Sequence, residues 1–222
     1  PHLSDGKSIP PKADRLVVDI GMGAEAARRK LNYGDRITLD GPLTPLLGDR
    51  VAAASLDDRA GCAAVIGAAK LLRECAAAEI SVALVSQEEV GSAGAATAAY
   101  ALAPDFAFAV DVSFGSTPDD RPEDCAEIGK GPMIGFAPIL DRALSRRLTE
   151  TAQKHGIPYQ TEIIGSRTGT DADFIAVSRG GVRTGLLSIP LRFMHTAGEI
   201  AALCDLEQTA RLLAKTIEEG LS

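Results

Sequence analysis

The chain carries acidic side chains and one histidine at positions where β-strands are expected to end. These candidate metal ligands and catalytic groups are Asp57, Glu88, Glu89, Asp111 and His195. Carboxylate oxygens and an imidazole nitrogen, with no thiolate among them, suit Zn²⁺, Co²⁺ or Mn²⁺ in a catalytic site. One carboxylate that bridges two ions, beside another that stays free as a base, is the equipment of a two-metal hydrolase.

The adjacent pair Glu88 and Glu89 is the centre of this pattern. It follows the apolar run 82–86, which has the composition of a buried strand in a parallel sheet. A second apolar run, 106–110, leads directly to Asp111. In open α/β sheets ligands bind beyond the carboxyl ends of the strands. Because neighbouring carboxylates repel each other, we expect cations to hold them there, and we predict a pair of metal ions.

Each of these residues also has an ordinary structural interpretation. Asp57 is a suitable N-cap for a following helix, and Glu89 is a possible solvated loop residue. Asp111 is compatible with a turn, and a single residue such as His195 is more often a core or surface histidine than a ligand. The metal hypothesis rests on their joint occurrence at the ends of separate predicted strands.

Composition narrows the class of protein. A chain of 222 residues with 45% apolar residues can build one substantial core. With 4% aromatic residues, no Trp and a net charge of −7, it lacks the features of a nucleic-acid-binding surface. The four cysteines are far apart and form no C-x-x-C pair, which predicts a reduced, cytoplasmic protein. No stretch has the length and hydropathy of a membrane span or a signal peptide, so we expect no membrane partner.

Secondary-structure signals change along the chain near residue 48. Before it we expect a strand at 15–20, small β-structure at 37–39 and a Gly/Pro-rich linker at 41–48. After it, strands and helices alternate, which indicates an α/β fold. Beyond the runs already described, we predict strands at 52–56, 159–164 and 182–189, and helices at 62–73, 142–155, 171–178 and 205–218. A further helix is expected in the alanine-rich segment after Gly94. The irregular segment 113–138, dense in Gly, Pro and Asp, is either a functional loop or contains small strands.

The segment Gly21-Met-Gly23-Ala-Glu-Ala26 offers a different hypothesis. It resembles a dinucleotide-binding fingerprint, with Asp40 near the offset expected for a ribose-binding acid. However, too few residues separate Gly23 from Asn32 for a crossover helix and a second parallel strand. A strand, a turn and a short helix are the simpler interpretation, and an NAD-dependent oxidoreductase is the weaker alternative.

Several motifs occur in an order that resembles one enzyme family. They are S-L-D-D-R-A-G at 55–61, S-Q-E-E-V-G-S-A-G-A at 86–95, A-V-D-V at 109–112, G-T-D-A at 169–172 and I-P-L-R-F-M-H-T at 189–196. This series resembles the dinuclear-metal aminopeptidases that form tetrahedral dodecamers, often named glutamyl aminopeptidases and sometimes misnamed endoglucanases. The resemblance spans essentially the whole chain.

The resemblance implies a role for each candidate residue. Asp57 would bridge two ions, with Glu89 and His195 completing the first ion's ligands and Asp111 serving the second. Glu88 would be the general base that acts on a metal-bridged water. The second ion's histidine belongs to an H-x-D motif that the family places before the first residue of this chain. We therefore expect a part of a longer protein, in which only one ion would be fully liganded by residues 1–222.

The resemblance also implies the architecture and the partners. Residues 1–48 would be the remnant of a small β-barrel accessory domain. Residues 49–222 would form a zinc-exopeptidase-like catalytic domain, in which helices flank a mixed, largely parallel sheet. The expected activity is removal of N-terminal residues from peptides with two ions, Zn or Co before Mn, in a homo-oligomer that is dimer-based or dodecameric. The alternative is a catalytically silent or one-metal homologue that acts as an assembly module.

Overall fold

The computed structural model describes residues 16–75, 78–118, 120 and 125–221. The chain divides into two units, residues 1–38 and 39–222, which are described separately. The described part of the first unit contains one short helix, α1 (Ala24–Lys30). Residues 16–20 form no strand, contrary to the prediction from their apolar character. Their side chains are exposed, and a strand needs a hydrogen-bonding partner that this segment lacks among the described residues.

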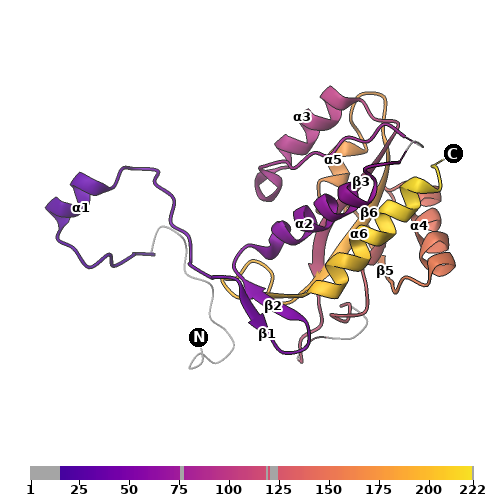
Figure 1. Cartoon of the computed structure of the whole chain (residues 1–222). Coiled ribbons are helices and arrows are strands. Elements are labelled where there is room, and N and C mark those ends of the chain that lie inside the picture. The colour runs from indigo at the N-terminus through magenta and orange to yellow at the C-terminus, as the bar shows by residue number, and fades with distance from the viewer. Residues whose placement is uncertain (1–15, 76–77, 119, 121–124, 222) are drawn as a thin grey trace. The chain divides into compact units, whose positions relative to one another are not determined.

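The second unit is built on a four-stranded sheet (Figure 1). Its strands follow the order β3 (Phe106–Phe114), β6 (Arg183–Leu191), β4 (Met133–Phe136) and β5 (Gln160–Ile163). The β3–β6 and β4–β5 pairs are parallel, whereas β4 and β6 are antiparallel. The predicted mixed, largely parallel sheet is confirmed, and β4 is a small strand of the kind that was one of the two alternatives for the segment 113–138.

A smaller antiparallel sheet contains β1 (Thr44–Leu46), β2 (Arg50–Ala53) and β7 (Glu199–Ala202). Strand β1 lies in the segment expected to belong to the accessory domain, yet it pairs with β2. The predicted strand at 37–39 is absent, and no closed barrel occurs among the described residues. The domain boundary near residue 48 remains a prediction.

Helices cover both faces of the main sheet. Leu187 and Leu186 of β6 point to opposite faces, because side chains alternate along a strand. Leu187 belongs to a core cluster with α2 (Leu56–Leu71), α4 (Arg142–His155) and α6 (Leu203–Glu218), and α2 and α6 lie side by side (Figure 1). Leu186 packs with Ala172 of the short helix α5 (Ala172–Ile175). None of the helices in the described residues is long and apolar enough to cross a membrane.

The prediction that the apolar run 82–86 forms a buried strand is wrong. The chain there has no strand hydrogen bonds, and Val82 and Leu84 are exposed. Apolar character indicates burial, but a strand also needs a neighbour, and no described strand pairs with this run. The run is still followed by a turn and then by helix α3 (Ala93–Leu102), as the glycine pattern predicts.

Helix α4 begins and ends as its sequence predicts. The Asp141 side chain accepts hydrogen bonds from the backbone N–H groups of Ala143 and Leu144, and Gly156 ends the helix with a φ of 60°. A hydrogen bond from Arg183 lowers the pKa of Asp141 below its ordinary value. Helix-capping bonds of this kind contribute about 1 kcal/mol each.

We expect Asp141→Ala to lower the free energy of unfolding by about 1 kcal/mol at pH 7, measured by urea denaturation. Because the folded-state pKa of Asp141 is depressed, the stabilisation of the fold by its ionised carboxylate is fully present above the unfolded-state pKa of about 3.9. It is lost as the pH falls through the lower folded pKa, so the difference between wild type and variant should shrink in acid. An undiminished difference below pH 3 would contradict the ionic part of this explanation.

Candidate metal centre

Three predicted ligands from distant parts of the sequence meet in space. Asp57 lies in the first turn of α2, Glu89 lies in a 3₁₀ turn (Glu88–Val90), and His195 lies between β6 and β7. One ligand atom from each lies within 4.8 Å of those of the other two. His195 Nε2 is 3.0 Å from Asp57 Oδ2 and 3.4 Å from Glu89 Oε2. The structure thus contains a possible metal-binding triad.

Two glycines of the predicted motifs allow this geometry. A Cβ on Gly61 would collide with the Asp58 carboxylate, which accepts a hydrogen bond from the Gly61 N–H at 2.9 Å. A Cβ on Gly94 would collide with the backbone of Ser86, which lies just before the two glutamates. Gly94 is therefore required where α3 approaches the chain before the two glutamates, whereas a side chain at position 61 would displace the Asp58 carboxylate from its hydrogen bond.

Asp111 lies near the triad but is not part of it. The sequence placed it at the end of a strand, whereas β3 continues to Phe114, so Asp111 is an internal strand residue. Its side chain is buried, with 8% exposure, and one oxygen accepts a hydrogen bond from the Val112 N–H at 2.8 Å. Asp111 interacts electrostatically with Asp57 and Glu88, which brings it into the same acidic cluster.

Burial and mutual repulsion make the cluster hard to ionise. Burial, followed by the charge of Glu89, raises the pKa of Asp57 to about 6, although the His195 imidazole opposes the shift. Burial and its acidic neighbours raise the pKa of Asp111 to about 7, against the Val112 hydrogen bond. Burial and Asp111 raise the pKa of Asp58 to about 9.

Glu88 faces the same cluster. Burial raises its pKa, and the negative charges of Asp171, Glu89 and Asp57 add to the shift. Burial also raises the pKa of Asp171, which a hydrogen bond with the Ser92 side chain opposes. One oxygen of Asp171 is buried with no hydrogen-bond partner among the described residues. The cluster thus contains six carboxyl groups, from Asp57, Asp58, Glu88, Glu89, Asp111 and Asp171.

A divalent cation fits this donor set. Carboxylate oxygens and an imidazole nitrogen are appropriate ligands for Zn²⁺, Co²⁺ or Mn²⁺. Positive charge among these side chains would offset the repulsion that raises their pKa values. Clusters of strongly perturbed acids gather at functional sites, so electrostatics and geometry point to the same place.

Three acids that the structure places in or beside the cluster were given no role from the sequence. Asp58 and Asp171 stand in the D-D-R and G-T-D-A motifs, but nothing in their spacing separates a member of the cluster from a surface acid. Glu199 follows His195 by four residues, and its carboxylate accepts hydrogen bonds from the backbone of both His195 and Asp57. The only signal in the sequence was a glutamate four residues after a candidate ligand.

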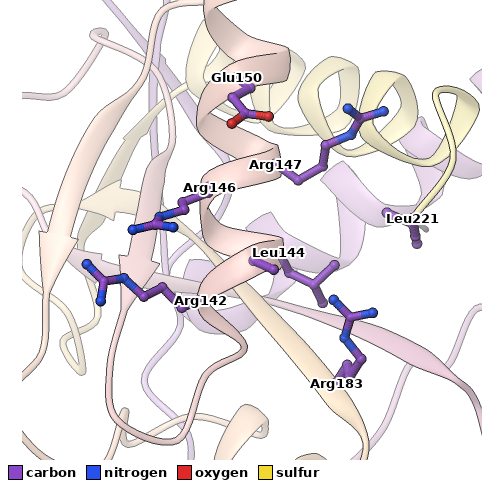
Figure 2. A pocket seen from close by; sticks show the side chains of 8 residues that line it. Arg142, Leu144, Arg146, Arg147, Glu150, Arg183 and Leu221 are labelled. Carbon is purple, nitrogen blue, oxygen red and sulfur yellow. The ribbon is translucent and has the colours of Figure 1, made fainter.

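A cavity of about 510 Å³ lies elsewhere, along α4 (Figure 2). Two of its arginines have structural partners: Arg183 pairs with Asp141 at 2.6 Å, and Arg147 donates to the Glu219 carbonyl at 3.0 Å. The cavity shares no residue with the acidic cluster. Its lining is Arg142, Ala143, Leu144, Arg146, Arg147, Glu150, Arg183 and Leu221.

Known proteins are similar to this chain in sequence and in fold. The lysyl aminopeptidase of Pyrococcus furiosus is 36% identical over 210 residues, which cover 93% of this chain and 60% of that protein. An aminopeptidase structure from Desulfurococcus kamchatkensis matches with a TM-score of 0.78 at 33% identity, covering 89% of this chain and 57% of that one.

The TET1 peptidase of Pyrococcus horikoshii, described as assembling into a tetrahedron or a large octahedral shell, matches with a TM-score of 0.75 at 31% identity. That match covers 97% of this chain and 64% of the TET1 chain. The chain thus spans about three fifths of the length of these relatives. The sequence pattern of the M42 glutamyl aminopeptidases matches residues 1–212, and the chain belongs to this family.

Proposed function

We propose that the protein containing this chain is a metal-dependent aminopeptidase that removes N-terminal residues from peptides. The observation that carries the proposal is the triad of Asp57, Glu89 and His195, with ligand atoms within 4.8 Å of one another. Its setting among further acids with raised pKa values favours bound cations over a chance surface cluster. Membership of an aminopeptidase family supports the class of reaction.

Asp57, Glu89 and His195 would hold one ion, and Asp57 and Asp111 would contribute to a second. Zn²⁺ or Co²⁺ fits this mixture of oxygen and nitrogen donors best, with Mn²⁺ as a further candidate. Bound divalent ions would polarise the scissile carbonyl and lower the pKa of water from about 15.7 toward 7.

Glu88 would act as the general base. It lies beside the candidate ligand Glu89 but outside the triad, so its carboxylate is free to accept a proton. It would accept a proton from the attacking water and donate it to the leaving amine. The raised pKa of Glu88 suits both steps, because the group must be ionised for the first and protonated for the second. The free amino terminus of the peptide would lie near the acids, which favours removal of terminal residues.

Metal titration tests the proposal. We expect the chain to bind Zn²⁺ or Co²⁺ in isothermal titration calorimetry, and Glu89→Gln to weaken that binding at least tenfold through loss of an anionic ligand. Glu150→Gln is the matched control, because it makes the same chemical change on the exposed surface of α4. Equal affinity in wild type and Glu89→Gln would refute the ligand role of Glu89.

The second candidate is a one-metal or catalytically silent homologue that serves as an assembly module. The observation in its favour is that the described residues bring together one group of three ligands, which Asp111 does not join. Metal stoichiometry and turnover, both measured in the protein that contains this chain, separate the two candidates. Two ions and hydrolysis of aminoacyl-anilides favour the enzyme, whereas one ion without hydrolysis favours the module.

A homo-oligomer in the cytoplasm is part of the proposal. Support for assembly comes from structural relatives described as a dodecamer, or as a tetrahedron or octahedral shell. Support for a reducing compartment comes from Cys62, Cys75 and Cys204, which are free thiols.

A further inference from the structure

The buried side chain of Glu199 connects two of the candidate ligands through their backbones. Its Oε1 accepts a hydrogen bond from the His195 N–H at 2.7 Å, and its Oε2 accepts one from the Asp57 N–H at 3.1 Å. The residue is 2% exposed. One carboxylate therefore links the segment of His195 to the segment of Asp57, which lies 142 residues before Glu199 in the sequence.

The location of Glu199 gives this connection a rigid base. Glu199 is the first residue of β7, where it pairs with Ala53 of β2. Backbone hydrogen bonds between Arg192 and Ile200 close the loop that carries His195. His195 itself has a φ of 63°, a left-handed conformation that a non-glycine residue adopts at a cost. A charged acceptor on its N–H helps to hold that conformation.

A carboxylate is the group that this arrangement requires. Both partners are donors, and each needs an oxygen lone pair. A glutamine at the same position would offer one oxygen and one NH₂ group, and the NH₂ would face an N–H. A buried charge is tolerated when hydrogen bonds compensate it, and here two N–H groups do so.

We propose that Glu199 is a positioning residue, which fixes the backbone of Asp57 and His195 so that their side chains meet around one ion. This inference rests on the proposed function, because it assigns Glu199 a purpose only if those side chains bind metal. Groups that orient metal ligands typically contribute 10–100-fold to affinity. Glu199 would act through the ligand backbones rather than through their side chains.

The test compares Glu199→Gln with wild type in calorimetric titration with Co²⁺. We expect the variant to bind about 10–100-fold more weakly. We also expect its Co²⁺ d–d absorption spectrum to change shape at saturating metal, because the ligand geometry relaxes. A purely structural role would lower the melting temperature of the metal-free protein and leave the spectrum of the bound ion unchanged.

Asp205→Asn is the matched control. Asp205 is also fully buried, and its carboxylate accepts from two backbone N–H groups, of Gly129 at 2.6 Å and Gly131 at 2.7 Å. Its electrostatic neighbours are Arg50 and Asp49 rather than the acidic cluster. We expect Asp205→Asn to lower thermal stability while the affinity and spectrum of Co²⁺ stay as in wild type.

The outcomes separate the two proposals. Wild-type affinity and spectrum in Glu199→Gln would overturn the role of Glu199 and leave the metal site standing. Absence of Co²⁺ binding by the wild type would overturn both. If circular dichroism shows that Glu199→Gln is unfolded, Glu199→Asp provides the same comparison, since its shorter carboxylate stays charged but cannot reach both N–H groups at their present distances.

Discussion

Replacing Glu88 by Gln is expected to reduce turnover of an aminoacyl-anilide by about 10²–10⁴-fold, the usual contribution of a general base. Glutamine has nearly the same shape but cannot accept a proton at neutral pH. Because Glu88 lies outside the group of Asp57, Glu89 and His195, metal content should remain that of the wild type. Turnover is measured in the protein that contains this chain, and metal content by elemental analysis.

This combination distinguishes two roles for the same side chain. A base mutant keeps the metal and loses the proton transfer, whereas a ligand mutant loses both. Glu89→Gln supplies the comparison, since it makes the identical change one residue away, in the candidate ligand. If Glu88→Gln lost metal as extensively as Glu89→Gln does, Glu88 would be a ligand and the proposed mechanism would be wrong.

The elements predicted best from sequence are those whose signals are local. Helix α4 has its cap at Asp141 and its terminating glycine at Gly156, so its limits follow from the chain itself. Strand β6 lies between helices on both faces, and the mostly apolar stretch from Leu186 to Leu191, broken by Ser188, identifies it without knowledge of its neighbours.

The predictions that failed depend on partners far away in sequence. The run 82–86 is as apolar as β6, but strand formation is decided by pairing, which composition does not reveal. Likewise the sequence predicts the end of β3 at Asp111, because the apolar run 106–110 stops at that acid. The strand continues because β6 offers a parallel partner as far as Leu191, opposite Phe114.

In the candidate site, too, local sequence signals predicted some residues, whereas those that depend on distant partners were not predicted. Residue type and order along the chain predicted Asp57, Glu89 and His195 as metal ligands, and the structure places these three side chains together. The hydrogen bonds from the ligand backbones to Glu199 could not be predicted from the sequence, because they depend on β7 lying beside β2. Asp58 and Asp171 belong to the cluster through burial, a property of the folded chain rather than of their motifs.

The second large effect is expected from Asp57→Asn, which should abolish metal binding and yet stabilise the metal-free protein at pH 8. Asparagine has nearly the same shape as aspartate but lacks the charge that a shared ligand of two ions needs. In the folded, metal-free state burial and Glu89 raise the pKa of Asp57 to about 6, so its ionised form is disfavoured there. Removing that charge removes the repulsion together with the ligand.

The pH dependence follows from the direction of this shift. The unfolded chain ionises Asp57 near pH 3.9, whereas the folded chain holds the proton until about pH 6. Between these values the folded state binds more protons, so the contribution of Asp57 to stability falls as the pH rises. The gain from Asp57→Asn should therefore be absent below pH 4, grow between pH 4 and 6, and be complete above that range.

Asp141→Asn provides a control of the opposite sign. Both variants replace an aspartate by its amide, but the pKa of Asp141 is lowered by Arg183, so its ionised form stabilises the fold. At pH 8, without metal, Asp57→Asn should raise the melting temperature and Asp141→Asn should lower it. With Co²⁺ present, wild type and Asp141→Asn should be stabilised and Asp57→Asn should not respond. If metal-free Asp57→Asn were less stable than wild type, Asp57 would support the fold and this explanation would be wrong. Opposite effects of the two variants would show that the Asp57 charge lowers the stability of the metal-free protein and is needed for ion binding.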